Sequence, residues 1–107
     1  MRKLILGIES SCDETAVAIV EDNNKLLANI ISTQVKVHEQ YGGVMPEVAS
    51  RLHLEAITPV LETALKEANV TMEDISAIAV TAGPGLIGAL HVGLQAAKTL
   101  SLVFKKP

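Results

Sequence analysis

Three short apolar runs open the chain and restrict most strongly what it can fold into. Leu4–Glu9 is a run of the kind found in a central strand buried on both faces. Thr15–Val20 is rich in Val, Ile and Ala, and the polar residues 21–24 that follow supply the chemistry of a hairpin turn. Lys25–Val35 returns as a third run. We therefore expect three consecutive strands in meander order.

Two long helical patterns follow, separated by a fourth strand. Pro46 suits the first position of a helix, because its missing N–H would be unpaired there, and apolar residues keep helical spacing as far as Ala68. The apolar run Ile75–Ala82 ends at a Gly-Pro-Gly break, and a second helix is expected from about residue 86 to about residue 104. Residues 37–45 contain two glycines and are expected to form a loop. The order β-β-β-α-β-α predicts an α/β fold with a mixed sheet and two helices.

The composition suits such a sheet and excludes several classes of protein. The chain is 49% hydrophobic, with one Tyr, one Phe and no Trp, so its core is expected to be aliphatic. Its net charge of −3 provides no broad basic surface for nucleic acid, so any RNA contacts would come mostly from elsewhere. Cys12 is the single cysteine, which favours a reduced, cytoplasmic compartment. Polar residues interrupt the segment 86–104, so no membrane span is expected.

The segment Glu9–Thr15 concentrates hydroxyls, carboxylates and backbone N–H groups in one turn between two strands. Such a turn can wrap phosphate oxygens, which makes Ser10, Ser11 and Thr15 candidate substrate or phosphate contacts. Its three carboxylates would repel each other and an anion unless a cation or an incoming amine were also present. A solvated acidic hairpin explains the same pattern equally well.

A second candidate contact with an anion is the loop Gly83–Gly88, which precedes a helix start. Free backbone N–H groups at such a start favour an anion, with Gly83 and Gly85 nearest to it. The loop lacks the Lys-Ser/Thr of a P-loop and the spacing of a dinucleotide fingerprint. A plain strand-to-helix turn is therefore the commoner explanation.

The three histidines are far apart in the sequence, so no metal site is expected from them alone. We expect His53 at the surface or in an interface, and Cys12 as a small buried filler. Small residues recur at positions i, i+4 and i+8 of the second helix, at Ala89, Gly93 and Ala97. Another backbone can approach closely there, and it could belong to the chain's own sheet, to its first helix or to a partner.

Three motifs, in order along the chain, resemble the signatures of a single family. They are Ile8–Thr15, then Tyr41–Val44 with Pro46–His53, then Thr81–Gly93. They are similar to the TsaD family of tRNA threonylcarbamoyladenosine transferases, formerly named O-sialoglycoprotein endopeptidase or Gcp. The resemblance implies an actin-like, sugar-kinase-like fold (the ASKHA or RNase H-like class) with two similar lobes and ligands in the cleft between them. Residues 1–107 would be the amino-terminal lobe, ending just before its last strand and lacking the second lobe.

The resemblance also implies a reaction. In this family the threonylcarbamoyl group passes from threonylcarbamoyl-AMP to N6 of the adenosine adjacent to the anticodon, in tRNAs that read codons beginning with A. Asp13 and Glu14 match the family's acidic pair and are the candidate catalytic residues, orienting or deprotonating the amine. This chain alone is expected to be inactive.

Cofactors and partners follow from the same resemblance. One divalent metal, iron or zinc, is expected in the full-length protein, but the family's His-x-x-x-His pair does not occur before Pro107, so this chain should hold none. The expected partners are TsaB-like and TsaE-like proteins, tRNA and a second copy of the chain, with a homodimer formed through the helices at Ala89, Gly93 and Ala97. A TsaB-like scaffold and a helix-mediated interaction module are the alternatives. The Cys-Asp-Glu-Thr turn and the Tyr-Gly-Gly segment argue against the scaffold.

Overall fold

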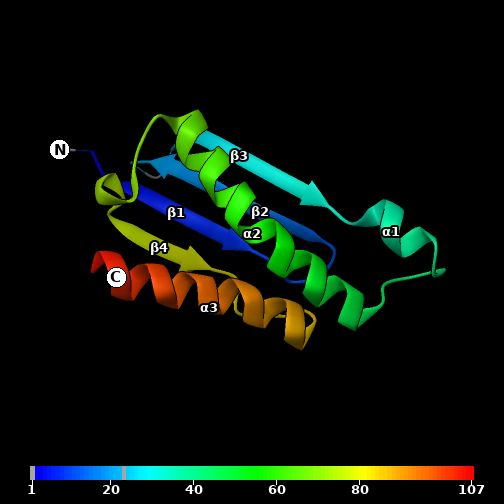
Figure 1. The fold of residues 1–107 in the computed structure, drawn as a ribbon. Coiled ribbons are helices and arrows are strands. Elements are labelled where there is room, and N and C mark those ends of the chain that lie inside the picture. The colour runs from blue at the N-terminus through cyan, green and yellow to red at the C-terminus, as the bar shows by residue number, and fades with distance from the viewer. Residues whose placement is uncertain (1, 23) are drawn as a thin grey trace.

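The computed structural model describes residues 2–22 and 24–107. Four strands form one sheet in the order β3-β2-β1-β4. These strands are β1 (Leu4–Glu9), β2 (Glu14–Glu21), β3 (Lys25–Thr33) and β4 (Ala77–Val80). The first three pair antiparallel, and β4 lies parallel to β1 (Figure 1). The predicted meander and mixed sheet are therefore confirmed.

The two long helices agree with the prediction from the sequence, whereas the two short ones were not predicted. The two long helices are α2 (Pro46–Ala68) and α3 (Ile87–Phe104), and α2 begins at the predicted proline. Two short helices were not expected: α1 (Val35–Glu39), which covers the predicted end of the third strand and the start of the loop, and the 3₁₀ turn η1 (Met72–Asp74). Short helices of this kind have too few residues to show a periodic pattern.

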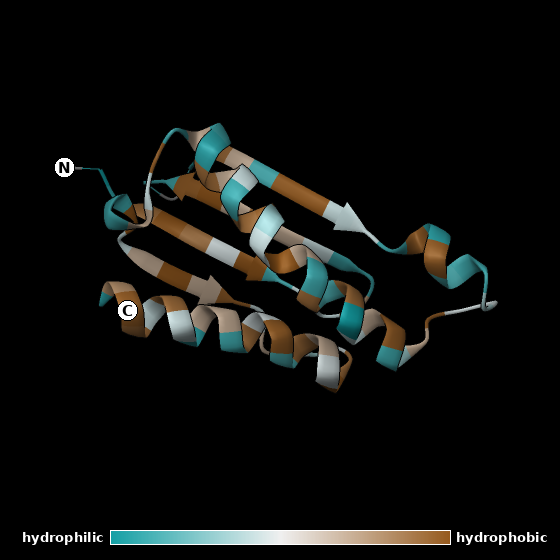
Figure 2. Cartoon of the chain, viewed as in Figure 1, coloured by the Kyte–Doolittle hydropathy of each residue, from teal (hydrophilic) through white to brown (hydrophobic). Residues whose placement is uncertain are grey.

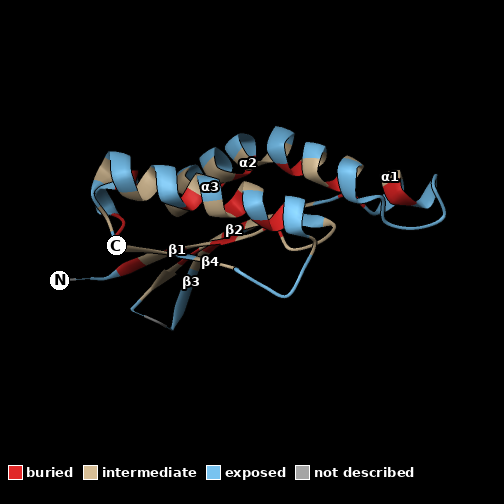
Figure 3. Cartoon of the chain, turned by 90° about the horizontal axis from the view of Figure 1, so that it is seen from below, coloured by how far each residue is buried: buried red, intermediate tan, exposed pale blue. Residues whose placement is uncertain are grey.

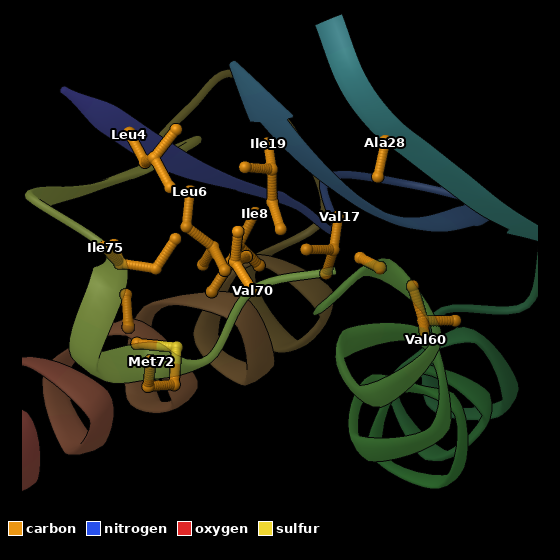
Figure 4. Packing of buried hydrophobic residues seen from close by; sticks show 12 residues of the cluster. Leu4, Leu6, Ile8, Val17, Ile19, Ala28, Val60, Val70, Met72 and Ile75 are labelled. Atoms are coloured by element: carbon orange, nitrogen blue, oxygen red, sulfur yellow. The ribbon is translucent and has the colours of Figure 1, made fainter. Parts of the chain in front are cut away.

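The core lies between the sheet and the two long helices. Leu4, Leu6 and Ile8 alternate along β1 and are at most 3% exposed, and Val17 and Ile19 of β2 are fully buried. Figure 4 shows these side chains gathered between the strands and the helices. In Figure 2 the strands are largely brown, whereas α2 alternates between apolar and polar segments. Full burial of each such aliphatic side chain stabilises a fold by about 1.5–3 kcal/mol, so the core supplies the main driving force.

The small residues of α3 belong to this internal packing. Ala89, Gly93 and Ala97 are all buried. A Cβ atom on Gly93 would meet Ser10 Oγ at 2.6 Å and Ile8 Cγ2 at 3.4 Å. Ala89 and Gly93 therefore lie against the end of β1, Ala97 belongs to the core, and no space is left along this row for a partner helix. Assigning these three residues to an external interface is thereby corrected in favour of the chain's own sheet.

Both long helices cover the same face of the sheet, and no described segment covers the other face (Figure 3). Small residues line a shallow hollow on that open face, among them Gly7, Ala18 and Ala79. After α3 the chain returns to the edge of the sheet, where the Ile78 N–H donates to the Pro107 carbonyl oxygen at 2.8 Å. The further strand expected at this edge stays a prediction. By length and composition α3 could cross a membrane, but here it packs against β1, β4 and α2.

Candidate functional site

The candidate site is the turn between β1 and β2, residues 9–14, at the carboxyl end of β1; we call it the acidic turn. The parallel strand β4 ends beside it, because Thr81 N–H donates to the Ile8 carbonyl oxygen at 3.1 Å. In open α/β sheets, ligands bind outside the carboxyl ends of such strands. Four separate segments contact the turn: residues 81–86 after β4, α3, one residue of α2, and Gln34 after β3.

Glu9 uses its carboxylate to hold the turn. Its Oε1 accepts the Ser11 backbone N–H at 2.6 Å, and its Oε2 accepts the Thr81 hydroxyl at 2.9 Å. Partial burial by itself would raise the pKa of this carboxyl, but the hydrogen bonds from Ser11 and Thr81, with the nearby His53, outweigh it and lower the pKa below its usual value. Glu9 is therefore an ionised structural residue, which accounts for one of the three carboxylates.

Ser10 joins the turn to α3. Its hydroxyl donates to the Ala89 carbonyl oxygen at 2.7 Å and accepts the Gly93 N–H at 3.1 Å. The residue is 1% exposed. Since the hydroxyl is buried and already occupied on both sides, the prediction that Ser10 contacts a phosphate is wrong for this structure.

Ser11 joins the turn to the Gly-Pro-Gly loop. Its carbonyl oxygen accepts the Leu86 N–H at 2.7 Å, and a Cβ atom on Gly85 would meet that oxygen at 2.5 Å. Glycine is therefore required at position 85 for this approach. Gly83, which precedes a cis peptide to Pro84, and Gly85 are both exposed. The structure thus brings Ser11, Gly83 and Gly85 to one end of the sheet, as a shared contact would need.

His53 joins the turn to α2 and is fully buried, so its predicted place at the surface is wrong. Its Nδ1 lies 2.6 Å from Thr15 Oγ1, and its Nε2 lies 2.9 Å from the Cys12 carbonyl oxygen. Thr15 is 1% exposed and uses its hydroxyl on this ring, which corrects its predicted contact with a ligand. Cys12 is half-buried rather than enclosed.

A sequence signal for His53 existed in the spacing of α2. His53 falls four residues after Ala49, seven before Val60 and eleven before Ala64, and all four are buried. These intervals mark one helical face. Treating histidine as a polar residue left His53 out of this buried face. A buried histidine needs two polar partners, and the linear sequence does not show them.

Asp13 and Glu14 keep their carboxylates free. Among residues 2–22 and 24–107, neither side chain takes part in a hydrogen bond or an ion pair. Glu14 is exposed at the start of β2, and Asp13 is half-buried. The backbone of the pair is nevertheless fixed, because the Asp13 carbonyl oxygen accepts the Gln34 N–H at 2.8 Å. The two candidate catalytic residues are therefore held at the backbone and unoccupied at the side chain.

Asp13 also lines a hollow with residues 35–44, which the sequence assigned mainly to a loop. His38 is 4% exposed there, with Nε2 lying 2.7 Å from Gln34 Oε1. Its Nδ1 accepts the Met45 N–H at 3.4 Å. Gly42 has a φ of +75°, a conformation that glycine adopts without strain. The Tyr-Gly-Gly segment is thereby placed beside the acidic turn.

Comparison with known proteins decides the family. A family model described as TsaD, tRNA N6-adenosine threonylcarbamoyltransferase, matches residues 25–107. The chain belongs to the TsaD family. The resemblance inferred from the three motifs is thereby confirmed. In this TsaD chain all three motifs meet at the acidic turn.

Curated TsaD relatives, each named tRNA N6-adenosine threonylcarbamoyltransferase, match almost the whole chain. A relative from Listeria monocytogenes is 56% identical over 104 residues, which is 97% of this chain and 30% of that protein. One from Lacticaseibacillus casei is 58% identical over 106 residues, 99% of this chain and 31% of that protein. The chain therefore spans about 30% of the length of the curated relatives it matches.

Solved structures share the fold at low sequence identity. YeaZ from Pseudomonas aeruginosa superimposes with a TM-score of 0.70 at 19% identity, covering 98% of this chain and 41% of that one. A crystal structure described as an uncharacterized protein with similarity to peptidase YEAZ from Pseudomonas aeruginosa gives a TM-score of 0.75 at 22% identity, again covering 98% and 41%. These neighbours share the arrangement of sheet and helices over 98% of this chain.

Proposed function

We propose that the complete protein, of the length of its TsaD relatives, transfers a threonylcarbamoyl group from threonylcarbamoyl-AMP to tRNA. The acceptor is N6 of the adenosine adjacent to the anticodon, in tRNAs that read codons beginning with A. This chain supplies the amino-terminal lobe and its acidic turn. Family membership supports the reaction class, and the structure supports the place of the turn in it.

One observation carries the proposal: residues from all three family motifs meet around two unoccupied carboxylates. Ser11 contacts Leu86, and Cys12 contacts His53, at 2.7 and 2.9 Å respectively. A Cβ atom on Gly88 would collide with Ser50 Oγ, so α3 and α2 also meet closely near the turn. Segments far apart in the sequence thus hold Asp13 and Glu14 at the end of the sheet.

The chemistry matches what these residues offer. The N6 nitrogen attacks the carbamoyl carbonyl carbon and forms a C–N bond, while the C–O bond to phosphate breaks and AMP leaves with that electron pair. The proton lost from N6 passes to a carboxylate, and Asp13 and Glu14 are the groups we assign to accepting it or to orienting the amine. Holding both reactants in line contributes more than the proton transfer itself, which is why a fixed backbone matters.

The leaving AMP needs contacts of its own. Ser11 is half-buried and lies against Gly85, which is exposed, as is Gly83 in the same loop. We assign the phosphate to these three residues. Ser10 and Thr15 do not contact the ligand. Their buried hydroxyls hold the same turn by hydrogen bonds to α3 and to His53.

The residues described here do not fit the divalent iron or zinc ion that the family resemblance implies. No group of three or more His, Cys, Asp or Glu side chains comes together among residues 2–22 and 24–107. We therefore route no step through a metal and place its ligands in the remaining 70% or so of the relatives' length.

For partners, we propose tRNA, a TsaB-like protein, a TsaE-like protein and a second copy of the chain, all in the cytoplasm. The YeaZ neighbours correspond to TsaB, and their shared lobe fits a TsaB-like partner. The outer faces of α2 and α3 expose aliphatic side chains, including Leu54 at 67% and Leu102 at 80% exposed. These faces, and not the buried small-residue row, are the surface available for helix-to-helix docking. The scaffold alternative is not favoured, because identity to curated TsaD proteins is 56–58%.

The test is a transfer assay with the complete protein, a TsaB-like partner, threonylcarbamoyl-AMP and a tRNA transcript. We expect release of AMP in step with modification of the tRNA. A transcript with inosine in place of the acceptor adenosine lacks the N6 amine and is the matched control. Equal modification of both transcripts, or none of either, would refute the proposed acceptor.

A further inference from the structure

We propose that His53 is a positioning residue, which sets the direction of Asp13 and Glu14 by holding the Cys12 carbonyl oxygen before them and the Thr15 hydroxyl after them. The part of this inference that concerns catalysis rests on the proposed function. The part that concerns the ring itself rests on geometry alone. His53 lies in one of the three family motifs, but the sequence alone indicates no role for it in catalysis.

The two hydrogen bonds indicate which ring nitrogen carries the proton when the ring is neutral. A carbonyl oxygen only accepts, so the 2.9 Å contact between Nε2 and the Cys12 carbonyl oxygen requires a proton on Nε2. In the neutral ring Nδ1 is then an acceptor, and it receives the Thr15 hydroxyl proton across 2.6 Å. For a neutral ring, the geometry therefore assigns the Nε2–H tautomer to His53.

The positions of the two partners explain why the ring matters for the turn. Cys12 directly precedes the acidic pair and Thr15 directly follows it, so one side chain from α2 holds both ends of a four-residue segment. Gln34 supplies a third hold through the Asp13 carbonyl oxygen at 2.8 Å. With these three contacts in place, little freedom is left in the backbone that aims the two carboxylates.

The burial of the ring argues for a specific role over simple filling of space. His53 is 0% exposed, and both of its nitrogens have partners. An apolar residue of similar size would fill the same volume on the stripe of Ala49 and Val60 but would leave the Cys12 carbonyl oxygen and the Thr15 hydroxyl without partners. Leaving such groups unpaired allows the turn to move, because each then needs another partner or water.

Three variants of the complete protein test the role in the turn. His53→Leu removes both hydrogen bonds, His53→Gln keeps an N–H donor near the position of Nε2, and Thr15→Val removes the hydroxyl that faces Nδ1. For His53→Leu we expect kcat to fall roughly 10- to 100-fold with little change in KM for tRNA, at a temperature where the variant is folded. His53→Gln is expected to recover most of that loss, and Thr15→Val to show an intermediate one.

Several outcomes would overturn the inference. They are a kcat for His53→Leu close to that of wild type, a loss that only follows the unfolded fraction, or a His53→Gln variant no better than His53→Leu. If His53→Leu does not fold, His53→Gln and Thr15→Val still decide, because a positioning role requires that Thr15→Val be less active than wild type.

A spectroscopic measurement separates this inference from the proposed function. Nitrogen-15 NMR of histidine-labelled complete protein is expected to show that the neutral ring of His53 carries its proton on Nε2, with the signals assigned by their loss in His53→Gln. A neutral ring protonated on Nδ1 would refute the inference even in an active enzyme. A wild-type protein that transfers nothing counts against the proposed function, while the ring measurement still decides the tautomer.

Discussion

At the scale of single residues, the three carboxylates of the acidic turn have different roles. Glu9 uses its carboxylate on Ser11 and Thr81, whereas the carboxylates of Asp13 and Glu14 make no hydrogen bond or ion pair among the described residues. The sequence predicts the turn, because its polar residues stand between two apolar runs. It does not predict which carboxylate is structural, since that depends on Thr81, seventy-two residues away.

Glu9 makes the stability of the turn depend on pH. Because the folded pKa of Glu9 lies below its ordinary value of 4.5, the ionised carboxylate stabilises the fold above that pH, and this contribution is lost as the pH falls through the folded value. We expect Glu9→Gln to lower the stability of the complete protein at pH 7 by about 1 kcal/mol, and the difference from wild type to shrink below about pH 4.

Thermal unfolding across this pH range measures the effect, with Glu67→Gln as the matched control. Glu67 is exposed on α2 and makes no hydrogen bond or ion pair in the described part of the chain. A Glu9→Gln difference that stays constant down to pH 3, or grows, would contradict the assigned role of Glu9.

At the scale of elements, the strands and long helices follow from the sequence because each is a periodic pattern long enough to identify. What the sequence leaves undetermined is the partner of each face. The row Ala89, Gly93 and Ala97 is as suited to a partner helix as to the chain's own sheet, and only the fold shows Ser10 lying against it. The short helix α1 is not predicted, because five residues are too few to show a helical period.

Gly93 provides the test of this packing. Alanine favours a helix over glycine by about 1 kcal/mol, but its Cβ atom would lie 2.6 Å from the buried Ser10 hydroxyl, which two hydrogen bonds hold in place. Overpacking of this kind costs about 1–3 kcal/mol, so we expect Gly93→Ala to destabilise the complete protein and lower its Tm. Gly43→Ala is the matched control, because a Cβ atom there would meet nothing within 4 Å. A Gly93→Ala variant as stable as wild type would mean that this contact is loose.

At the scale of the whole molecule, the described chain exposes two separate apolar surfaces. The outer faces of α2 and α3 form an aliphatic groove that includes Leu54, Leu61 and Leu100. The opposite face of the sheet is lined by small residues. Two separate apolar surfaces on one chain suit the assembly proposed above, in which one faces a partner and the other faces the rest of the same protein.

A charge placed in the groove separates these surfaces. We expect Leu54→Glu to weaken binding of a TsaB-like partner at least about tenfold without lowering the Tm, because Leu54 is 67% exposed and a charge disfavours burial in an apolar interface. Leu26→Glu is the matched control, since Leu26 is 59% exposed on the edge strand β3 and does not line the groove. Calorimetric titration with the partner measures both. Equal binding by the two variants would move the interface away from α2 and α3.

The rate of transfer by Glu14→Ala in the complete protein tests the central claim most directly, namely that the acidic turn serves the chemistry. Glu14 is exposed and unpaired among the described residues, so its removal should leave the Tm unchanged. We expect formation of modified adenosine to fall by roughly 100-fold, the scale of a lost acid–base or orienting group, while Glu67→Ala stays at the wild-type rate. A Glu14→Ala protein that modifies tRNA as fast as wild type, or slows only as far as it unfolds, would contradict the account.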